Sequence, residues 1–209
     1  MDPESGKELA DGQVGEIWVH GDNMAAGYLN RPEETEETFR NHLPMANRLE
    51  SGSRAADVPE DKWMRTGDLA VIVDGHLFIT GRLKDLIIVA GRNHYPQDIE
   101  ATADEATEQT APAVIAAFAV QAGDAGTAGA GADGESVEGL VIIAERDPEA
   151  AEADDAEAIE AMRAAVTATH GVQPSDVRII APGALPRSSA NKIARRVAAK
   201  AYLEGTLDA

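Results

Sequence analysis

Alternating and continuous apolar runs divide the first part of the chain into short predicted strands. Residues 14–20 alternate apolar and polar side chains, which predicts a half-buried strand. Residues 63–81 hold two apolar runs joined by an Asp-Gly pair that tolerates positive φ, and they therefore predict a β-hairpin. Between these segments, Pro32 followed by two glutamates indicates a helix start, and the polar residues 41–61 predict a long loop.

The pattern changes after about Lys84, where we place a domain boundary. Strands and helices then alternate irregularly, which predicts an α+β fold with a small sheet and helices packed against it. Residues 121–139 are rich in glycine and alanine with scattered acids, and they predict a mobile loop. The predicted helices are 96–108, 147–170 (ended by Gly171) and 189–204 (ended by Gly205), and the predicted strands are 113–120, 140–145 and 177–181.

Composition and charge exclude several classes of function. The 209 residues include 37 acidic and 18 basic ones, for a net charge of −19, so neither a nucleic acid nor an anionic membrane surface is expected as the main partner. Cysteine is absent, which excludes disulfides, thiolate metal sites and cysteine nucleophiles. The five histidines show no ligand-like pairing, and we predict no metal site. Without a signal-peptide core or an apolar run of membrane-spanning length, the sequence predicts a cytoplasmic protein with no membrane span.

Five cations crowd into a short C-terminal segment of this acidic chain: Arg187, Lys192, Arg195, Arg196 and Lys200. Lys192 falls in the first turn of the predicted helix 189–204, where the helix dipole disfavours a cation by about 0.3–1 kcal/mol. A residue placed against its local preference suggests a functional role. The alternative is that these residues are surface cations that neutralise an acidic fold.

Residues 81–100, GRLKDLIIVAGRNHYPQDIE, have the character of a hinge. They combine a charged run, an apolar run, a turn at Gly91 and a helix start at Pro96. The stretch resembles the hinge of the adenylate-forming enzymes, which include acyl-CoA synthetases, luciferases and the adenylation domains of peptide synthetases. Its ending, GRNHYPQDIE, is similar to the fatty acyl-AMP ligases, most of all to actinobacterial ones that feed polyketide synthases.

Three further segments match motifs of that family in the same order: GEIWVHGDNMAAGYLNRPEET, WMRTGDLA and LPRSSANKIARR. The resemblance spans nearly the whole chain but only the last third of such an enzyme. It implies that residues 1–83 are the last β-rich subdomain of the N-terminal adenylation domain, and that residues 84–209 are the mobile C-terminal lid domain. Such a fragment is expected to be inactive alone, to bind no cofactor tightly, and to leave the magnesium ligand in an N-terminal region.

The resemblance also implies roles for two nucleotide-binding residues. Asp68, in TGD, would accept hydrogen bonds from both ribose hydroxyls of ATP or AMP, which a carboxylate can do. The alternative for Asp68 is a turn-forming aspartate after Gly67. Arg82 would approach the nucleotide as well, and its alternative is a surface ion pair with Asp85.

Three more roles follow from the resemblance. Lys192 would be the catalytic lysine that bridges the carboxylate substrate and the α-phosphate and ribose oxygens of ATP. The serine and glycine usual before this lysine are replaced here by Ala190 and Asn191. Lys84 would be the hinge residue, and Gly91 would let a pantetheine arm pass close to the backbone. The alternatives are a solvated lysine and an ordinary turn glycine.

By this resemblance the parent enzyme activates a long-chain fatty acid with ATP and Mg²⁺ to an acyl-adenylate. It then transfers the acyl group to the phosphopantetheine of an acyl carrier protein or polyketide synthase carrier domain. One alternative is a long-chain acyl-CoA synthetase, which shares the first step but uses CoA as acceptor. The others are a non-catalytic module that docks carrier proteins, and a small α+β domain without a site.

Overall fold

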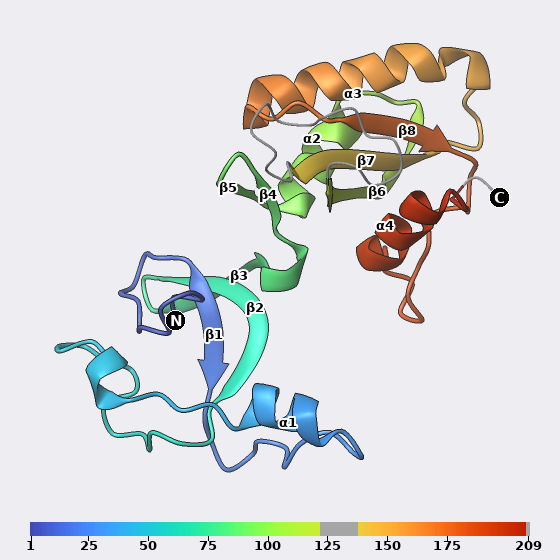
Figure 1. Cartoon of the computed structure of the whole chain (residues 1–209). Helices are drawn as coiled ribbons and strands as arrows, with labels where there is room; N and C mark the ends of the chain where they lie inside the picture. The colour runs from blue at the N-terminus through green and yellow to red at the C-terminus, as the bar shows by residue number, and fades with distance from the viewer. Residues whose placement is uncertain (122–137, 208–209) are drawn as a thin grey trace. The chain divides into compact units, whose positions relative to one another are not determined.

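The computed structural model describes residues 1–121 and 138–207, which fold into two compact units, Met1–Lys84 and Asp85–Ala209 (Figure 1). The mobile loop predicted at 121–139 falls on residues 122–137, which lie outside the described residues, and on the ends of two strands.

The first unit is built on a three-stranded antiparallel sheet. Its strands are β1 (Gly15–Val19), β2 (Met64–Val73) and β3 (His76–Arg82), in the order β1-β2-β3. Asp74 and Gly75 join β2 to β3 at φ 50° and 77°, which confirms the predicted hairpin turn. Helix α1 (Pro32–Phe39) begins at its proline, as predicted.

The long loop predicted in this unit is ordered around a buried arginine. Arg48 is 8% exposed and donates hydrogen bonds to the carbonyls of Leu43 (3.0 Å) and Val58 (2.7 Å), and to that of Ala55. Leu43 and Ala55 are themselves buried against Trp63. The guanidinium therefore satisfies loop carbonyls that a buried segment would otherwise leave unpaired.

The second unit has a mixed sheet and a separate short hairpin. Strand β7 (Glu138–Arg146) lies in the middle, antiparallel to β6 (Thr110–Gln121) and parallel to β8 (Asp176–Ile180). The hairpin pairs β4 (Ile87–Val89) with β5 (Arg92–His94).

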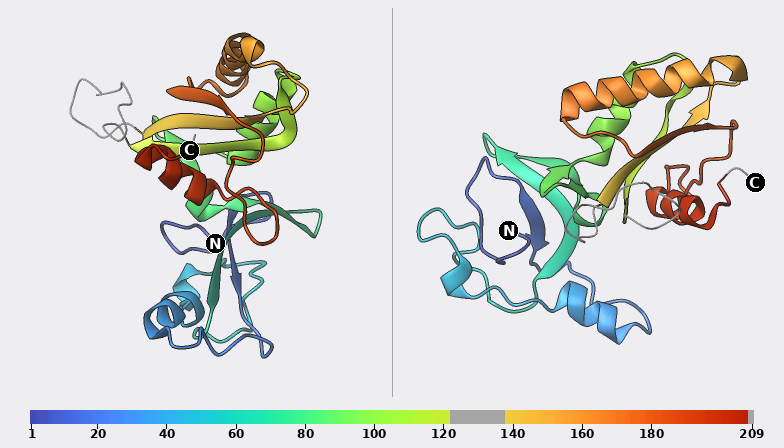
Figure 2. Two further views of the ribbon diagram at one scale, coloured as in Figure 1. Left: turned by 90° about the vertical axis from the view of Figure 1, so that its right-hand side faces the viewer. Right: turned by 45° about the horizontal axis from the view of Figure 1, so that its top comes forward.

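Helices cover both faces of this sheet, and β7 divides its side chains between them. Helices α2 (Pro96–Glu105) and α3 (Asp155–His170) lie on one face and α4 (Arg195–Glu204) on the other (Figure 2). Alternate β7 residues enter the two cores: Leu140, Ile142 and Ala144 on the α2–α3 side, Val141 and Ile143 on the α4 side. A strand buried on both faces has a continuous apolar run, and the predicted α+β class is confirmed.

Two predicted helix starts are wrong, at 147 and at 189. Helix α3 begins eight residues later, because Asp147 forms a local turn instead: its side chain accepts a 2.8 Å hydrogen bond from the amide of Glu149. At its other end, α3 stops at Gly171, which has φ 67°, as predicted. Helix α4 begins at Arg195, and the residues before it form the loop described next.

Candidate functional site

Lys192 lies in a closed loop that precedes α4. Arg187 and Ile193 form an antiparallel bridge at its base, and the amide of Ser188 donates a 2.8 Å hydrogen bond to the Lys192 carbonyl. Asn191 has φ 58°, a left-handed conformation that asparagine tolerates and that a helix excludes. Lys192 lies next to Ile193, near the C-terminal end of the loop, and its side chain is exposed. It is not part of a helix.

This geometry corrects the interpretation of the five cations. Lys192 is not in the first turn of a helix, so the dipole argument made for it is wrong. The cations that open α4 are Arg195 and Arg196, and its first turn holds no acid. Their positions carry the unfavourable dipole interaction that the sequence pattern assigned to Lys192.

The five cations also differ in what they contact. Arg195 and Arg187 pair with the carboxylates of Glu100 and Glu145, and Lys200 makes an exposed pair with Glu204, one turn away on α4. Lys192 and Arg196 are exposed, and neither has an ion pair within residues 1–121 and 138–207. The segment is thus a mixture of anchored and solvated cations.

Asp68 and Arg82 lie opposite each other on β2 and β3 in the first unit. Arg82 Nε donates a 2.8 Å hydrogen bond to Asp68 Oδ1, and the arginine and aspartate side chains are 67% and 33% exposed. Asp68 is therefore a strand residue and not part of a turn. Within the first unit, the partner of Arg82 is thus Asp68.

A buried glutamate supports the TGD segment and was missed in the sequence. Glu16 is 3% exposed and accepts hydrogen bonds from Arg65 (2.7 Å), from Trp18 Nε1 (3.0 Å) and from the amide of Gly67 (3.2 Å). Burial raises the pKa of Glu16, but the hydrogen bonds from Arg65 and Trp18 outweigh it and hold the pKa below its ordinary value. The signal was an acid in the middle of an apolar strand, which pairs when it is buried.

Lys84 and Gly91 occupy two turns. Lys84 is exposed, in the 3₁₀ turn Leu83–Asp85, and is the last residue of the first unit. Gly91 has φ 71° and, with Ala90 at φ 50°, joins β4 to β5. A Cβ on Gly91 would meet no described atom within 4 Å, so the space beside this glycine is open.

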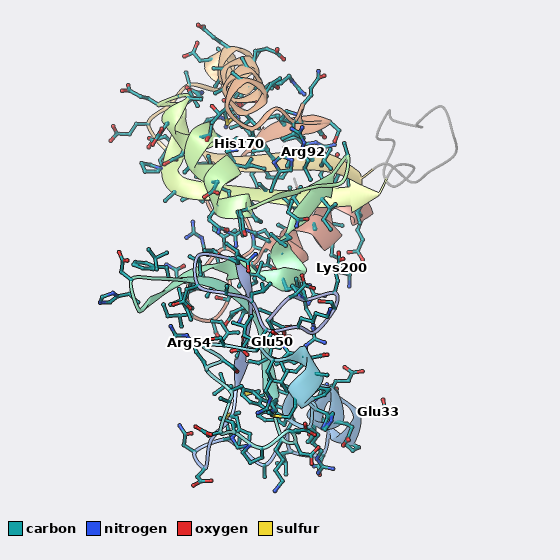
Figure 3. All side chains as sticks on the ribbon, turned by 90° about the vertical axis from the view of Figure 1, so that its left-hand side faces the viewer. Glu33, Glu50, Arg54, Arg92, His170 and Lys200 are labelled. Atoms are coloured by element: carbon teal, nitrogen blue, oxygen red, sulfur yellow. The ribbon has the colours of Figure 1, made fainter. Side chains whose placement is uncertain are left out.

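The strand after Gly91 carries a small cluster of basic side chains. Arg92 and His170 (both labelled in Figure 3) lie close enough to His94 to affect its ionisation. Burial lowers the pKa of His94, and electrostatic interaction with His170 and Arg92 lowers it further. His170 Nε2 also lies 2.8 Å from Thr102 Oγ1 on α2, which fixes one side of the cluster.

No cavity, metal-binding group or membrane span among the described residues adds to the candidate site. A cavity of about 360 Å³ lies in the first unit among Trp18, Leu43, Trp63 and their neighbours, but Asp68 and Arg82 do not line it. In residues 1–121 and 138–207, no group of three or more histidine, aspartate or glutamate side chains could hold a metal ion. No helix in that part of the chain is long and apolar enough to cross a membrane.

Individual known proteins resemble this chain, although no protein-family model matches it. It is 44% identical over its whole length to the long-chain-fatty-acid–AMP ligase FadD32 of Mycolicibacterium smegmatis, and covers 34% of that protein. It is 35% identical to a Mycobacterium leprae protein that carries the name of a fatty-acid–CoA ligase, fadD21, with 97% of the chain and 32% of the relative covered. The chain therefore spans about a third of the length of these relatives.

Solved structures of adenylate-forming enzymes are also similar to this chain. A structure from work on fatty acyl-adenylate ligases from E. coli and L. pneumophila matches with a TM-score of 0.67 and 28% identity, over 94% of this chain and 29% of that one. ATP-bound MatB from Rhodopseudomonas palustris matches with a TM-score of 0.64 and 28% identity, over 98% of this chain and 33% of that one. The predicted resemblance to adenylate-forming enzymes is confirmed.

Proposed function

We propose that this chain is the C-terminal part of a long-chain fatty acyl-AMP ligase. The observation that carries the proposal is its similarity, over its whole length, to a protein named as such a ligase. The complete protein would join a fatty acid to ATP, release pyrophosphate and hold the acyl-adenylate. It would then transfer the acyl group to the phosphopantetheine thiol of a carrier protein, in the cytoplasm, where ATP and carrier proteins are available.

Lys192 is our candidate for the catalytic lysine of the first step. Negative charge develops on the α-phosphate oxygens as the fatty acid carboxylate attacks phosphorus, and a nearby ammonium stabilises that charge. The exposed position of Lys192 at the end of a closed loop supports this role, because the ammonium is available to a ligand. A lysine suits the task since it offers a compact charge and three donors on a long stem.

Asp68 and Arg82 are our candidates for nucleotide binding. Asp68 Oδ1 accepts the hydrogen bond from Arg82, whereas Oδ2 has no hydrogen bond within the described residues. The second oxygen can accept a ribose hydroxyl. Asp68 and Arg82 are therefore suited to binding the nucleotide of ATP. Among the described residues, no group of carboxylates is suited to binding Mg²⁺. On the family resemblance, we propose that the magnesium ligand belongs to an N-terminal region of the complete protein.

Lys84 and Gly91 are our candidates for the switch to the second step. A change of backbone torsion at Lys84 would move the second unit and exchange the surfaces it presents to the acyl-adenylate. The open space beside Gly91 supports passage of a pantetheine arm there. Transfer of the acyl group to CoA is the second candidate for this step. It is supported by the relative that carries the name of a fatty-acid–CoA ligase.

The test uses the complete protein that contains this chain. Lys192→Ala is expected to lower ATP–pyrophosphate exchange with a long-chain acid by about 10² or more, the range for losing one stabilising donor, while transfer from supplied acyl-adenylate survives. Arg196→Ala is the matched control, because it removes an exposed cation four residues away. Unchanged exchange in Lys192→Ala would contradict the adenylation role and favour a carrier-docking surface. Comparing CoA with a carrier protein as acceptor decides between ligase and synthetase.

A further inference from the structure

The loop that carries Lys192 is held at its base while its lysine is exposed. The amide of Ala194 donates a 2.9 Å hydrogen bond to the carbonyl of Pro186, next to the bridge between Arg187 and Ile193. These backbone bonds close the loop on itself, but they do not attach it to the rest of the second unit. Attachment comes from side chains at the two ends of the loop, where Ile193 packs against the apolar core on the α4 side of the sheet and two arginines pair with glutamates.

Arg195 attaches the C-terminal end of the loop to α2. Its Nε and one terminal nitrogen donate hydrogen bonds of 2.6 and 2.5 Å to the two oxygens of Glu100, in a forked arrangement. The arginine and glutamate side chains are 26% and 14% exposed. Glu100 is itself fixed, because it also accepts a 2.9 Å hydrogen bond from the amide of Ala117 on β6. The hydrogen bonds from Arg195 to Glu100 raise the pKa of Arg195, so this cation stays charged.

Arg187 attaches the N-terminal end of the loop to β7. One terminal nitrogen lies 3.5 Å from Oε2 of Glu145, a side chain that is 5% exposed. The other oxygen of Glu145 accepts a 2.7 Å hydrogen bond from the amide of Leu185, which precedes the loop. The buried glutamate thus binds the backbone and the side chain of the same end of the loop.

We propose that Arg195 is a positioning residue for Lys192, acting through Glu100, with Arg187 and Glu145 as the second anchor. The inference rests on the proposed function of Lys192 and extends it to the residues that hold the lysine in place. Both oxygens of Glu100 are taken by Arg195, and a forked pair restricts orientation as well as distance. Arg195 follows Lys192 by three positions, so a shift of the pair moves the lysine.

This assignment separates Arg195 from the other cation at the start of α4. Both Arg195 and Arg196 lie where the helix dipole disfavours positive charge. Arg195 is compensated by Glu100 and by Asp85 at 3.9 Å, whereas Arg196 is exposed and has no ion pair among the described residues. Asp85 follows Lys84 directly, so the network of Arg195 also reaches the residue after the proposed hinge.

The kinetic test compares Arg195→Ala and Arg195→Lys with Arg196→Ala in the complete protein. Misplacement of a catalytic group by about 1 Å costs about 10²-fold in rate. We therefore expect Arg195→Ala to lower kcat of ATP–pyrophosphate exchange by about 10-fold or more, with KM for the fatty acid and transfer from supplied acyl-adenylate unchanged. Arg195→Lys keeps the positive charge but cannot donate the two parallel hydrogen bonds to Glu100, and it is expected to recover part of the ATP–pyrophosphate exchange rate. Exchange at the wild-type rate in Arg195→Ala overturns the proposal.

A double variant separates positioning from independent binding. If Arg195 acts only through Lys192, adding Arg195→Ala to Lys192→Ala lowers exchange no further than Lys192→Ala alone. A further loss of about 10-fold in the double variant overturns the proposal, because Arg195 would then contribute by itself. Lys192→Ala with full activity refutes the proposed function of the lysine, whereas an inactive Lys192→Ala beside a fully active Arg195→Ala refutes only the positioning role.

Hydrogen exchange measures the order of the loop whether or not the protein is active. The amides of Ser188, Asn191 and Ala194 are donors within the loop, and Arg195→Ala is expected to speed their exchange by about 10-fold or more. Arg196→Ala leaves them unchanged. Glu100→Gln removes the negative charge from the same ion pair and is the alternative variant if Arg195→Ala fails to fold. Unchanged exchange rates in both Arg195→Ala and Glu100→Gln overturn the proposal.

Discussion

Arg82 donates a 2.8 Å hydrogen bond to Asp68 directly across the pair of strands β2 and β3. The two residues that the sequence proposed as nucleotide ligands thus orient each other. The arginine side chain is 67% exposed, and an ion pair this exposed contributes at most about 1 kcal/mol to stability. The proposed role of this pair in nucleotide binding can therefore be tested with little loss of stability.

Arg82→Ala is expected to weaken nucleotide binding while leaving the fold intact. Hydrogen bonds to charged groups contribute about 1.5–3 kcal/mol when a ligand makes them, which corresponds to a rise of about 10-fold or more in KM for ATP. Steady-state exchange assays on the complete protein measure KM, and thermal unfolding measures stability.

The matched control for Arg82 is Arg54→Ala in the same unit. Arg54 (labelled in Figure 3) pairs with Asp11 at 2.9 Å, and the two side chains are 57% and 54% exposed. Both variants should lose similar, small amounts of stability. An equal KM for ATP in both would show that the Arg82 pair is structural only.

The tyrosine on α4 makes the attachment of that helix sensitive to alkaline pH. The Tyr202 hydroxyl donates a 2.8 Å hydrogen bond to Asp176 Oδ2, and Arg178 lies over the ring. Burial, followed by the hydrogen bond and the negative charge of Asp176, raises the pKa of Tyr202 to about 12. Since this folded-state pKa lies above the ordinary value of about 10, the contribution is complete below about pH 10 and is lost as pH rises through 12.

Tyr202→Phe is therefore expected to cost about 1 kcal/mol in unfolding free energy near neutral pH. The difference from the wild type should shrink as pH rises from about 10 toward 12, which denaturant unfolding at several pH values measures. Tyr28→Phe, at a tyrosine that is 51% exposed, is the control and should change little. A pH-independent cost at position 202 would assign the loss to packing instead of ionisation.

Local signals were enough to predict most of the fold. The Asp-Gly turn, the proline at the start of α2 and the glycine at the end of α3 each act through backbone torsions that neighbouring residues determine. The start of α4 was misplaced because helix-compatible residues extend to Ser189, whereas Asn191 adopts a left-handed torsion and Ser188 bonds the loop. These local loop bonds compete with helix formation in the same residues, and residue spacing does not reveal which of the two wins.

The partners of the candidate site residues were harder to predict. Counting back from the Asp74–Gly75 turn, Val73 pairs with His76 and Ala70 with Ile79, a register that would place Gly81 opposite Asp68. A shift between Leu69 and Ala70 moves the register by one residue and brings Arg82 there instead. Arg195 and Glu100 are 95 residues apart, so their pairing depends on how α2 and α4 pack around the sheet.

The ion pair at the start of α3 makes the second unit sensitive to acid. Hydrogen bonds from Arg146, at 3.0 and 2.5 Å, hold the pKa of Asp155 below its ordinary value. Because the folded-state pKa is lowered, this stabilisation is present above about pH 4 and is lost as pH falls below it. Asp155→Asn should cost about 1 kcal/mol at neutral pH and progressively less as the pH falls below about 4.

Denaturant unfolding across that pH range tests the prediction for Asp155. The control is Glu160→Gln on the same helix, where the pair with Arg163 spans 3.5 Å and the glutamate side chain is 74% exposed. That variant should stay within about 0.5 kcal/mol of the wild type at every pH. If Asp155→Asn lost the same amount at low and neutral pH, the carboxylate charge would not be the cause.

Gly91 can be tested against a turn of the same geometry in the other unit. Gly91 has φ 71° after Ala90 at 50°, and Gly75 has φ 77° after Asp74 at 50°. Neither glycine has a described atom within 4 Å of where a Cβ would lie. Alanine at either position therefore carries the same backbone strain, about 1–2 kcal/mol, without a steric clash.

The two alanine variants should then differ only in function. We expect Gly91→Ala to slow acyl transfer from supplied acyl-adenylate by about 10-fold or more, because an added methyl narrows the space that a pantetheine arm would need. ATP–pyrophosphate exchange should stay near the wild-type rate in both variants, and Gly75→Ala should transfer normally. Equal transfer rates in Gly91→Ala and Gly75→Ala would leave Gly91 as a turn residue, since strain alone would then account for its glycine.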